Sequence, residues 1–172
     1  MAKMGRDVKT RKGFGAPERI IADAEPALLA LNNAHATELS WLEPGRLSQL
    51  VAAAFYAKRL GPADAFMLAF DQTAAYDSPN FLWFRARFPR FVYVDRIVVA
   101  LELRGQGLAR SLYADLFANA RAHGHALVGC EVNLLPPNPL SDAFHAALGF
   151  TEAGRAEIHG GAKTVRYLTR PL

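Results

Sequence analysis

A strand pattern, a glycine turn and a helix pattern follow one another directly near the middle of the chain, and this succession most constrains the fold. Residues 91–100 (FVYVDRIVVA) are β-branched and aromatic, which predicts a strand. After RGQG at 104–107, apolar residues recur every four positions, which predicts an amphipathic helix that ends at Gly124. Glycines at such a junction let backbone N–H groups converge beside the positive end of the helix dipole. The sequence therefore predicts an anion site here.

The patterns on either side of this unit predict one mixed α/β domain over residues 18–172. Further strands are expected at 18–24, 54–60, 65–71 and 125–133, helices at 25–39, after Gly45 and at 141–148, and a hairpin around Gly160–Gly161. The segment 54–60 could equally extend the helix before it, and 72–90 is expected to be a long aromatic connection. One strand-helix-strand unit among these elements predicts a mixed central sheet flanked by helices.

The net charge of +4 belongs to the N-terminal end of the chain. Residues 1–13 carry five of the 20 basic residues and one of the 16 acidic residues, so the rest of the chain is balanced. We therefore expect residues 1–17 to be a basic, flexible tail. A nucleic-acid-binding protein would need a basic face on the fold itself, and no such partner is expected.

Composition excludes several other classes of protein. The single cysteine, Cys130, excludes an internal disulfide framework and a cysteine-cluster metal site. No apolar run approaches the roughly 18 residues of a membrane span, and the basic N-terminal residues precede no apolar signal segment. We expect a cytoplasmic protein that contacts no membrane and holds no metal.

Spacing separates three kinds of anion site at the glycine turn. A dinucleotide fold requires G-x-G-x-x-G, but Arg110 stands at the third glycine position and no acidic residue follows about twenty residues later. A nucleoside-triphosphate loop requires a lysine at the helix start, and none is present. The residues instead match R-x-x-G-x-A, with Arg104, Gly107 and Ala109.

This pattern resembles the signature of the GNAT superfamily of acyl-CoA N-acyltransferases, Q/R-x-x-G-x-G/A at the same junction. The resemblance implies that backbone amides from Gly105 to Arg110 hold the pyrophosphate of acetyl-CoA, and that a strand N–H between Ile97 and Val99 polarises the thioester carbonyl. The cofactor-binding residues that it implies are Ile97, Val98, Val99, Arg104, Gly105, Gln106, Gly107, Leu108, Ala109, Arg110, Asn133, Asn138 and Ser141.

A second motif, Cys130–Phe150, is similar to the later motif of the same superfamily. Asn138 matches the asparagine that touches the pantetheine arm, and Leu148-Gly149-Phe150 match the end of a short helix. The two motifs together cover 91–150, whereas the N-terminal third matches only in element order. The resemblance implies an acetyl-CoA-dependent N-acetyltransferase that acts on an amine of a small molecule or a protein. Homodimers are common in the superfamily, and no sequence feature demonstrates one here.

Glu131 is the candidate general base. It resembles the strand glutamate of ribosomal-protein N-terminal acetyltransferases, although this chain has two extra residues around Pro136-Pro137. Strand alternation puts Glu131 and Asn133 on one face. Asp95 is the alternative base and is expected on the same strand face as Ile97. Either carboxylate could instead be a structural partner of an arginine, and a water relay could replace a single base.

His145 is the candidate general acid. Members of the superfamily have a tyrosine three residues before the leucine of the LGF motif, where this chain has His145. An imidazolium with a pKa near roughly 6.5 can protonate a leaving thiolate. The alternative is a histidine on a surface helix that makes one hydrogen bond.

The aromatic connection before residue 91 is the candidate acceptor-binding segment, because aromatic rings and acids together can surround an ammonium group. The same residues could simply pack over the sheet edge. The substrate-binding candidates are Asn32, Asp71, Tyr76, Phe81 and Trp83. The alternative function is a catalytically degenerate sensor that binds acyl-CoA without transfer, and a dinucleotide-binding module is disfavoured.

Overall fold

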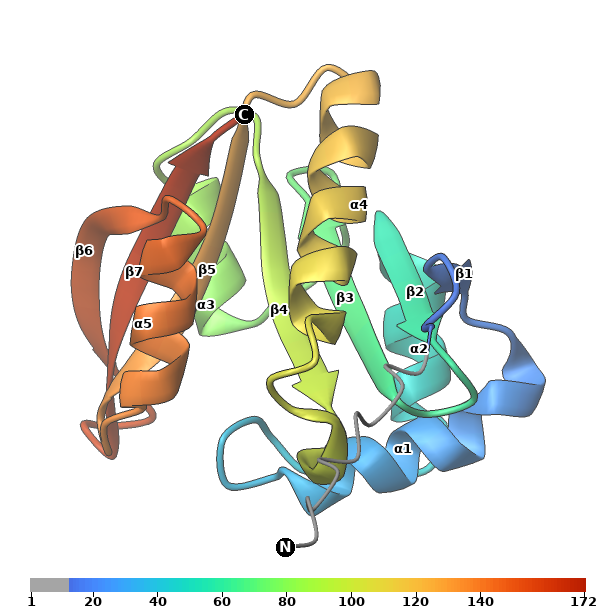
Figure 1. The fold of residues 1–172 in the computed structure, drawn as a ribbon. Coiled ribbons are helices and arrows are strands. Elements are labelled where there is room, and N and C mark those ends of the chain that lie inside the picture. Colours follow the sequence, from blue (N-terminus) through green and yellow to red (C-terminus); the bar gives the residue numbers. More distant parts are fainter. Residues whose placement is uncertain (1–12) are drawn as a thin grey trace, which may run out of the picture.

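The computed structural model describes residues 13–172 and contains a seven-stranded mixed sheet with helices on both faces (Figure 1). The strand order is β1-β2-β3-β4-β5-β7-β6. The pair β4–β5 is parallel, and the other pairs are antiparallel. The elements are β1 Glu18–Arg19, η1 Ala22–Ala24, α1 Glu25–Ala34, α2 Arg46–Ala53, β2 Tyr56–Leu60, β3 Ala65–Asp71, α3 Pro79–Arg85, β4 Val92–Val99, η2 Leu101–Leu103, α4 Leu108–Ala122, β5 Leu127–Leu135, α5 Pro139–Ala147, β6 Thr151–Ile158 and β7 Lys163–Pro171.

Two apolar clusters hold the helices to the sheet, one on each face. On one face the apolar stripe of α4, including Leu112 and Leu116, packs against strand residues such as Met67, with α5 beside it. On the other face α1, α2 and α3 bury residues such as Phe84 against the sheet. The predicted mixed sheet flanked by helices is confirmed.

The sheet splits between β4 and β5. The two strands pair only at Val92–Val128 and Tyr93–Gly129, and beyond these residues they diverge, as Figure 1 shows. The backbone of β4 beyond Tyr93 therefore has no strand partner on its β5 side. A parallel sheet opened in this way leaves room for a ligand between two strands.

A β-bulge lies in β4 at this split. Leu68 of β3 pairs with Arg96 and Ala69 pairs with Val94, so Asp95 has no partner on β3. The extra residue shifts the alternation of side chains. Asp95 faces the α3 side, where it contacts Tyr76, whereas Ile97 packs against the α4 side. The expectation that Asp95 and Ile97 share a face is therefore wrong.

Several predicted boundaries also differ from the structure. The strand expected at 18–24 is reduced to β1, an edge strand of two residues, and a 3₁₀ turn follows it. The connection expected at 72–90 contains α3, which begins with Pro79 at its first position, where proline needs no N–H partner. Residues 1–12 of the predicted tail lie outside the described residues, and Phe14 packs against the core.

Among residues 13–172, no helix combines the length and apolar character needed to cross a membrane. The same residues hold no cluster of three or more histidine, cysteine or acidic side chains suited to a metal ion.

Candidate active site

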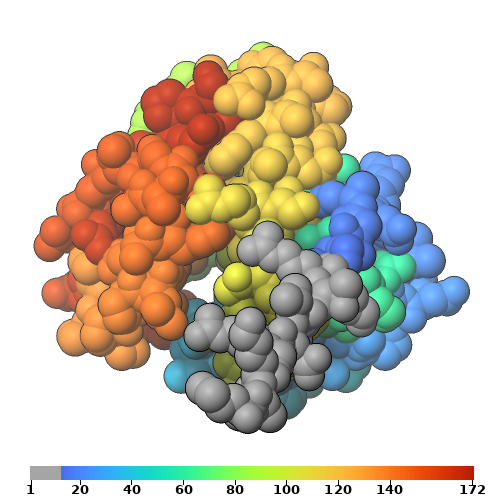
Figure 2. All heavy atoms as spheres, viewed as in Figure 1, coloured from blue at the N-terminus to red at the C-terminus, as the bar shows by residue number. Residues whose placement is uncertain are grey.

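Three adjoining cavities run through the split between β4 and β5. The central cavity, about 120 Å³, is lined by residues that include Ile97, Tyr113, Cys130, Glu131 and His145. The glycine-turn groove, about 480 Å³, shares Ile97 and His145 with it. The β6–β7 pocket, about 190 Å³, shares Glu131 with it. Figure 2 shows the surface hollowed between α5 and the yellow segments of β4 and α4. Glu131 thus stands where the central cavity meets the β6–β7 pocket.

The glycine turn has the conformation that an anion site requires. Gly105 and Gly107 have φ values of 77° and 90°, and Gly107 caps α4 without a side-chain hydrogen bond. A Cβ atom added at either glycine would meet nothing within 4 Å. Arg104 and Arg110 line the groove beside these glycines. Open backbone, a free helix N-terminus and two guanidinium groups suit a diphosphate.

Glu131 is held by two hydrogen-bond donors from different elements. Tyr93 Oη donates to Glu131 Oε2 at 2.7 Å and Asn80 Nδ2 donates to Oε1 at 3.0 Å. Asn80 is itself oriented by Tyr167, whose hydroxyl donates to its Oδ1 at 3.0 Å. Burial raises the pKa of Glu131 to about 8, with a further increase from Asp95, while the donors from Tyr93 and Asn80 oppose it. The carboxyl group therefore changes charge close to neutral pH.

Asp95 lies in a paired and buried environment instead. It accepts hydrogen bonds from Tyr76 Oη at 2.6 Å and from Arg96 Nε at 2.7 Å. The side chains of Asp95 and Arg96 are only 6% and 5% exposed, and Arg96 Nη1 donates to Asn32 Oδ1 at 2.8 Å. This geometry engages both carboxylate oxygens of Asp95 with buried partners, which suits a structural role better than proton transfer.

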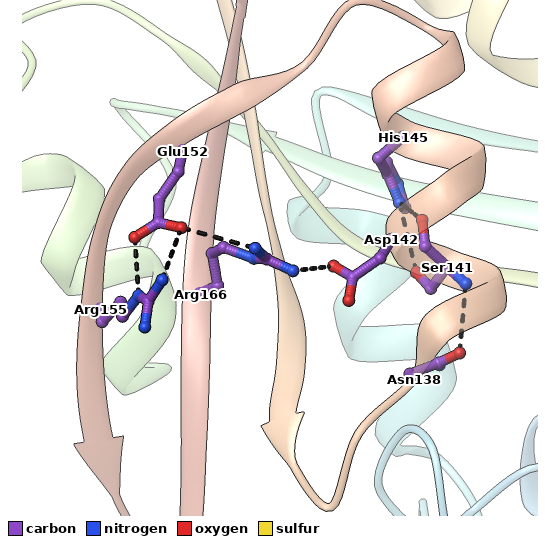
Figure 3. Close-up of polar contacts among 7 residues, drawn as sticks. All are labelled: Asn138, Ser141, Asp142, His145, Glu152, Arg155 and Arg166. Carbon is purple, nitrogen blue, oxygen red and sulfur yellow. Dashed lines mark hydrogen bonds and ion pairs between the residues drawn. The ribbon is translucent and has the colours of Figure 1, made fainter.

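His145 has both ring nitrogens occupied. Its Nδ1 lies 2.8 Å from the carbonyl oxygen of Ser141, one turn back on α5, as Figure 3 shows. Its Nε2 lies 2.8 Å from the hydroxyl of Tyr113 on α4. Burial lowers the pKa of His145, although the Ser141 carbonyl and Asp142 act in the opposite direction. The residue is 4% exposed and so is not a surface histidine.

The helix that carries His145 is anchored at its start and at its outer side. Asn138 caps α5 through a hydrogen bond from Ser141 N to Asn138 Oδ1 at 3.2 Å. Asp142 accepts from Arg166 of β7 at 2.5 Å, and Arg166 also contacts Glu152 of β6 (Figure 3). These contacts keep α5 at a fixed distance from the sheet and so help to keep the split open.

The remaining cofactor-binding candidates lie along the cavities, with one exception. Val98 and Val99 line the central cavity, Leu108 and Ala109 line the groove, and Asn133 lines the central cavity and the β6–β7 pocket. Asn138 and Ser141 line both the central cavity and the groove. The side chain of Gln106 instead turns back to the carbonyl oxygen of Glu102 at 3.4 Å.

The substrate-binding candidates are not brought together. Tyr76 lines the β6–β7 pocket, and Asn32 is buried behind Arg96. Asp71 is the last residue of β3, and its Oδ2 lies 3.9 Å from His125 Nε2. Phe81 is fully buried, and Trp83 stacks on Tyr167 at a centroid distance of 4.0 Å. Most of the aromatic segment therefore packs over the sheet.

Three residues of the site carried no sequence signal that singled them out. Tyr93 and Tyr113 lie at core positions of a strand and a helix, and Asn80 lies on the helix that the sequence did not predict. A tyrosine at a core position is itself a usable signal, because a buried hydroxyl needs a hydrogen-bond partner.

Comparisons with known proteins bear on the family and the fold. Residues 66–150 match the model of the acetyltransferase (GNAT) family. A search of curated proteins found no match.

Solved structures share the fold at low sequence identity. The ribosomal-protein-S18-alanine N-acetyltransferase of Escherichia coli is 16% identical, with 91% of this chain and 92% of that chain covered and a TM-score of 0.63. Ard1 of Thermoplasma volcanium is 12% identical, with 91% and 97% covered and a TM-score of 0.71. The ribosomal-protein-alanine N-acetyltransferase of Brucella melitensis is 17% identical, with 91% and 99% covered and a TM-score of 0.67.

Proposed function

The chain belongs to the acetyltransferase (GNAT) family, and we propose that it transfers the acetyl group of acetyl-CoA to an amine held beside Glu131. One observation carries this proposal. The cavities connect an anion-binding glycine turn to a carboxyl group whose pKa lies near 8, through a gap between two strands. A simple anion-binding protein has no need of such a carboxyl group at the far end of the passage.

The glycine-turn groove fits the cofactor. An amide cradle with open space at Gly105 and Gly107 would receive the diphosphate, and Arg104 and Arg110 would balance its charge. The apolar residues Leu140 and Phe144 line the same groove and would contact the pantetheine arm. Acetyl-CoA supplies the thioester from which the acetyl group is transferred.

Glu131 is proposed as the group that takes the proton from the incoming amine. A base is most effective when its pKa lies near the working pH, and burial brings the pKa of Glu131 to about 8. Tyr93 and Asn80 hold the carboxyl group in place at the mouth of the β6–β7 pocket. Backbone N–H groups of β4 between Ile97 and Val99 are proposed to polarise the thioester carbonyl, since they lie along the split.

The β6–β7 pocket is the proposed site of the acceptor amine. Its walls include Tyr76, Asn80 and Glu131 on one side and Ile158 and Lys163 of the hairpin on the other. Two of the proteins with this fold are named for acetylation of a ribosomal-protein alanine. We therefore place protein amino groups beside small amines in the proposed acceptor class.

A thiol-release assay with acetyl-CoA and a panel of acceptors tests this function. The panel should contain peptides with free N-termini, the same peptides with blocked N-termini, and small primary amines. Release of thiol that depends on a free amine supports the proposal. Calorimetric binding of acetyl-CoA without thiol release for any amine would instead indicate a sensor module. Binding of NAD but not of acetyl-CoA would reject both the acetyltransferase and the sensor.

A further inference from the structure

Tyr113 is a buried phenol in the wall of the central cavity. The residue is 0% exposed on the stripe of α4 that packs on the sheet, yet it lines the cavity together with His145 and Glu131. Its hydroxyl lies 2.8 Å from His145 Nε2. Two side chains from two helices thus meet at the cavity wall, where neither has a role in the proposed base chemistry.

The contact with Ser141 determines which atom of the pair donates. A carbonyl oxygen only accepts, so His145 Nδ1, 2.8 Å from the Ser141 carbonyl oxygen, carries a hydrogen, and the Ser141 hydroxyl, 3.2 Å from the same nitrogen, can accept as well. In the neutral ring Nε2 then accepts, and Tyr113 donates its hydroxyl hydrogen to it. When the ring gains a proton, Nε2 becomes a donor to Tyr113 Oη, and the Tyr113 hydroxyl hydrogen turns away from the ring, towards Cys130 and the central cavity that Cys130 lines.

Neither residue can serve as an acid alone. His145 has no free N–H to offer a substrate, because one nitrogen faces Ser141 and the other faces Tyr113. Tyr113 alone would be left as a buried phenolate, and burial raises its pKa well above the usual value. No phenolate forms if His145 gives a proton to the phenol oxygen while Tyr113 gives up its own.

We propose, on the basis of the acetyl transfer proposed above, that Tyr113 and His145 form one proton-donating unit for the leaving sulfur. The amine nitrogen bonds to the carbonyl carbon, the carbon–sulfur bond breaks, and the sulfur keeps the electron pair. The sulfur takes the hydroxyl proton of Tyr113, Tyr113 Oη takes the Nε2 proton of His145, and the neutral ring keeps its Nδ1–H on Ser141. Tyr113 is the catalytic residue, and His145 both positions it and resupplies its proton.

The groups that face this pair set its pH dependence. Cys130 and Glu131 of β5 lie on the Tyr113 side, and Asp142 of α5 favours the protonated form of His145. Because burial lowers the pKa of His145, the donor-competent state is most populated on the acidic side of neutrality. Because ionisation of Glu131 compensates for the loss of the His145 proton up to a pH of about 8, wild-type turnover should fall only above that pH, whereas the residual turnover of Glu131→Gln should fall once the pH exceeds the His145 pKa.

Single and double variants test the unit. Tyr113→Phe should lower kcat by about 10²- to 10⁴-fold with little change in the KM for acetyl-CoA. His145→Phe should cost about as much, and the double phenylalanine variant no more than either single one. Tyr56→Phe is the matched control, because its buried hydroxyl donates to Asp115 and lines none of the three cavities.

Imidazole ¹⁵N NMR of the ligand-free protein supplies a readout that does not depend on activity. The neutral ring of His145 should show its hydrogen on Nδ1 in the wild type. A hydrogen on Nε2 would overturn the proposal, as would unchanged kcat in Tyr113→Phe or multiplicative losses in the double variant. If the wild-type protein releases no thiol with any amine, the proposed function fails; if it does and Tyr113→Phe is unaffected, the proton-donating unit alone fails.

Discussion

Tyr93 on β4 donates a 2.7 Å hydrogen bond to Glu131 on β5, across the point where these strands cease to pair. The last paired residues are Tyr93 and Gly129, so Glu131 is the second residue beyond the ladder. The contact holds a carboxyl group inside the split while the backbones move apart. The split and the candidate base thus arise from the same divergence of two strands.

Replacing Glu131 by glutamine should lower kcat/KM by about 10²- to 10⁴-fold, because the amide keeps the shape of the side chain but cannot take a proton. The ratio of wild-type to variant kcat/KM should rise as pH approaches 8, where Glu131 ionises, because glutamine does not titrate while both proteins share the loss of the His145 proton. Steady-state thiol release over a pH series measures both effects. Glu18→Gln is the control, since Glu18 is an exposed carboxylate of β1 that lines none of the three cavities. Equal activity of wild type and Glu131→Gln would exclude Glu131 as the base.

The same substitution should change stability in a pH-dependent way. The folded protein keeps a proton on Glu131 up to a pKa of about 8, whereas the unfolded chain releases it near 4.5. This contribution to wild-type stability is complete below about pH 4.5 and is lost as pH rises through 8, by an amount on the order of 5 kcal/mol. Glutamine does not titrate, so Glu131→Gln should gain stability relative to wild type between about pH 5 and about pH 9. A constant difference in unfolding free energy by denaturant titration would contradict the raised pKa.

Asp95→Asn should destabilise the fold by about 3–5 kcal/mol, because it leaves Arg96 buried without its counter-charge. Thermal or denaturant unfolding measures this loss, and Asp71→Asn provides a control at the more exposed end of β3. If Asp95→Asn folds with wild-type stability but loses turnover, Asp95 rather than Glu131 is the base.

Gly107→Ala should weaken acetyl-CoA binding by about tenfold or more, equivalent to about 1.4 kcal/mol. Its Cβ would enter the open cradle, and a φ of 90° strains a non-glycine residue by about 1–2 kcal/mol. Gly45→Ala is a matched control: Gly45 also caps a helix, has a φ of 82° and faces open space, but lies outside the groove. Calorimetry should show similar losses of stability for both variants and weaker binding only for Gly107→Ala. Equal acetyl-CoA affinity in both variants would place the diphosphate elsewhere.

The strand, glycine turn and helix were predictable because each is specified by local sequence. The four-residue apolar repeat of α4 ends at Gly124, and the structure has α4 ending at Ala122 with Gly124 at a φ of 75°. The short helix before Gly149 and the terminal hairpin are likewise specified by residues close together in the sequence. The alternation on β5 also holds, since Glu131 contacts α3 while Cys130 and Val132 join the α4-side core.

What the sequence did not predict depends on contacts between distant residues. The bulge at Asp95 is visible only once β3 is paired with β4, and it reverses which face Asp95 occupies. The Tyr113–His145 contact joins positions 32 residues apart on two helices. Helix α3 was missed because a short segment that begins with proline and is rich in aromatic residues is as consistent with a loop as with a helix.

A crystal structure of the protein with bound coenzyme A tests the central claim most directly. We expect its diphosphate on the backbone amides from Gly105 to Arg110, and its thiol in the split between β4 and β5, near Tyr113 and Glu131. Coenzyme A bound at another surface, or no bound coenzyme A at saturating concentration, would contradict acetyl transfer by this site.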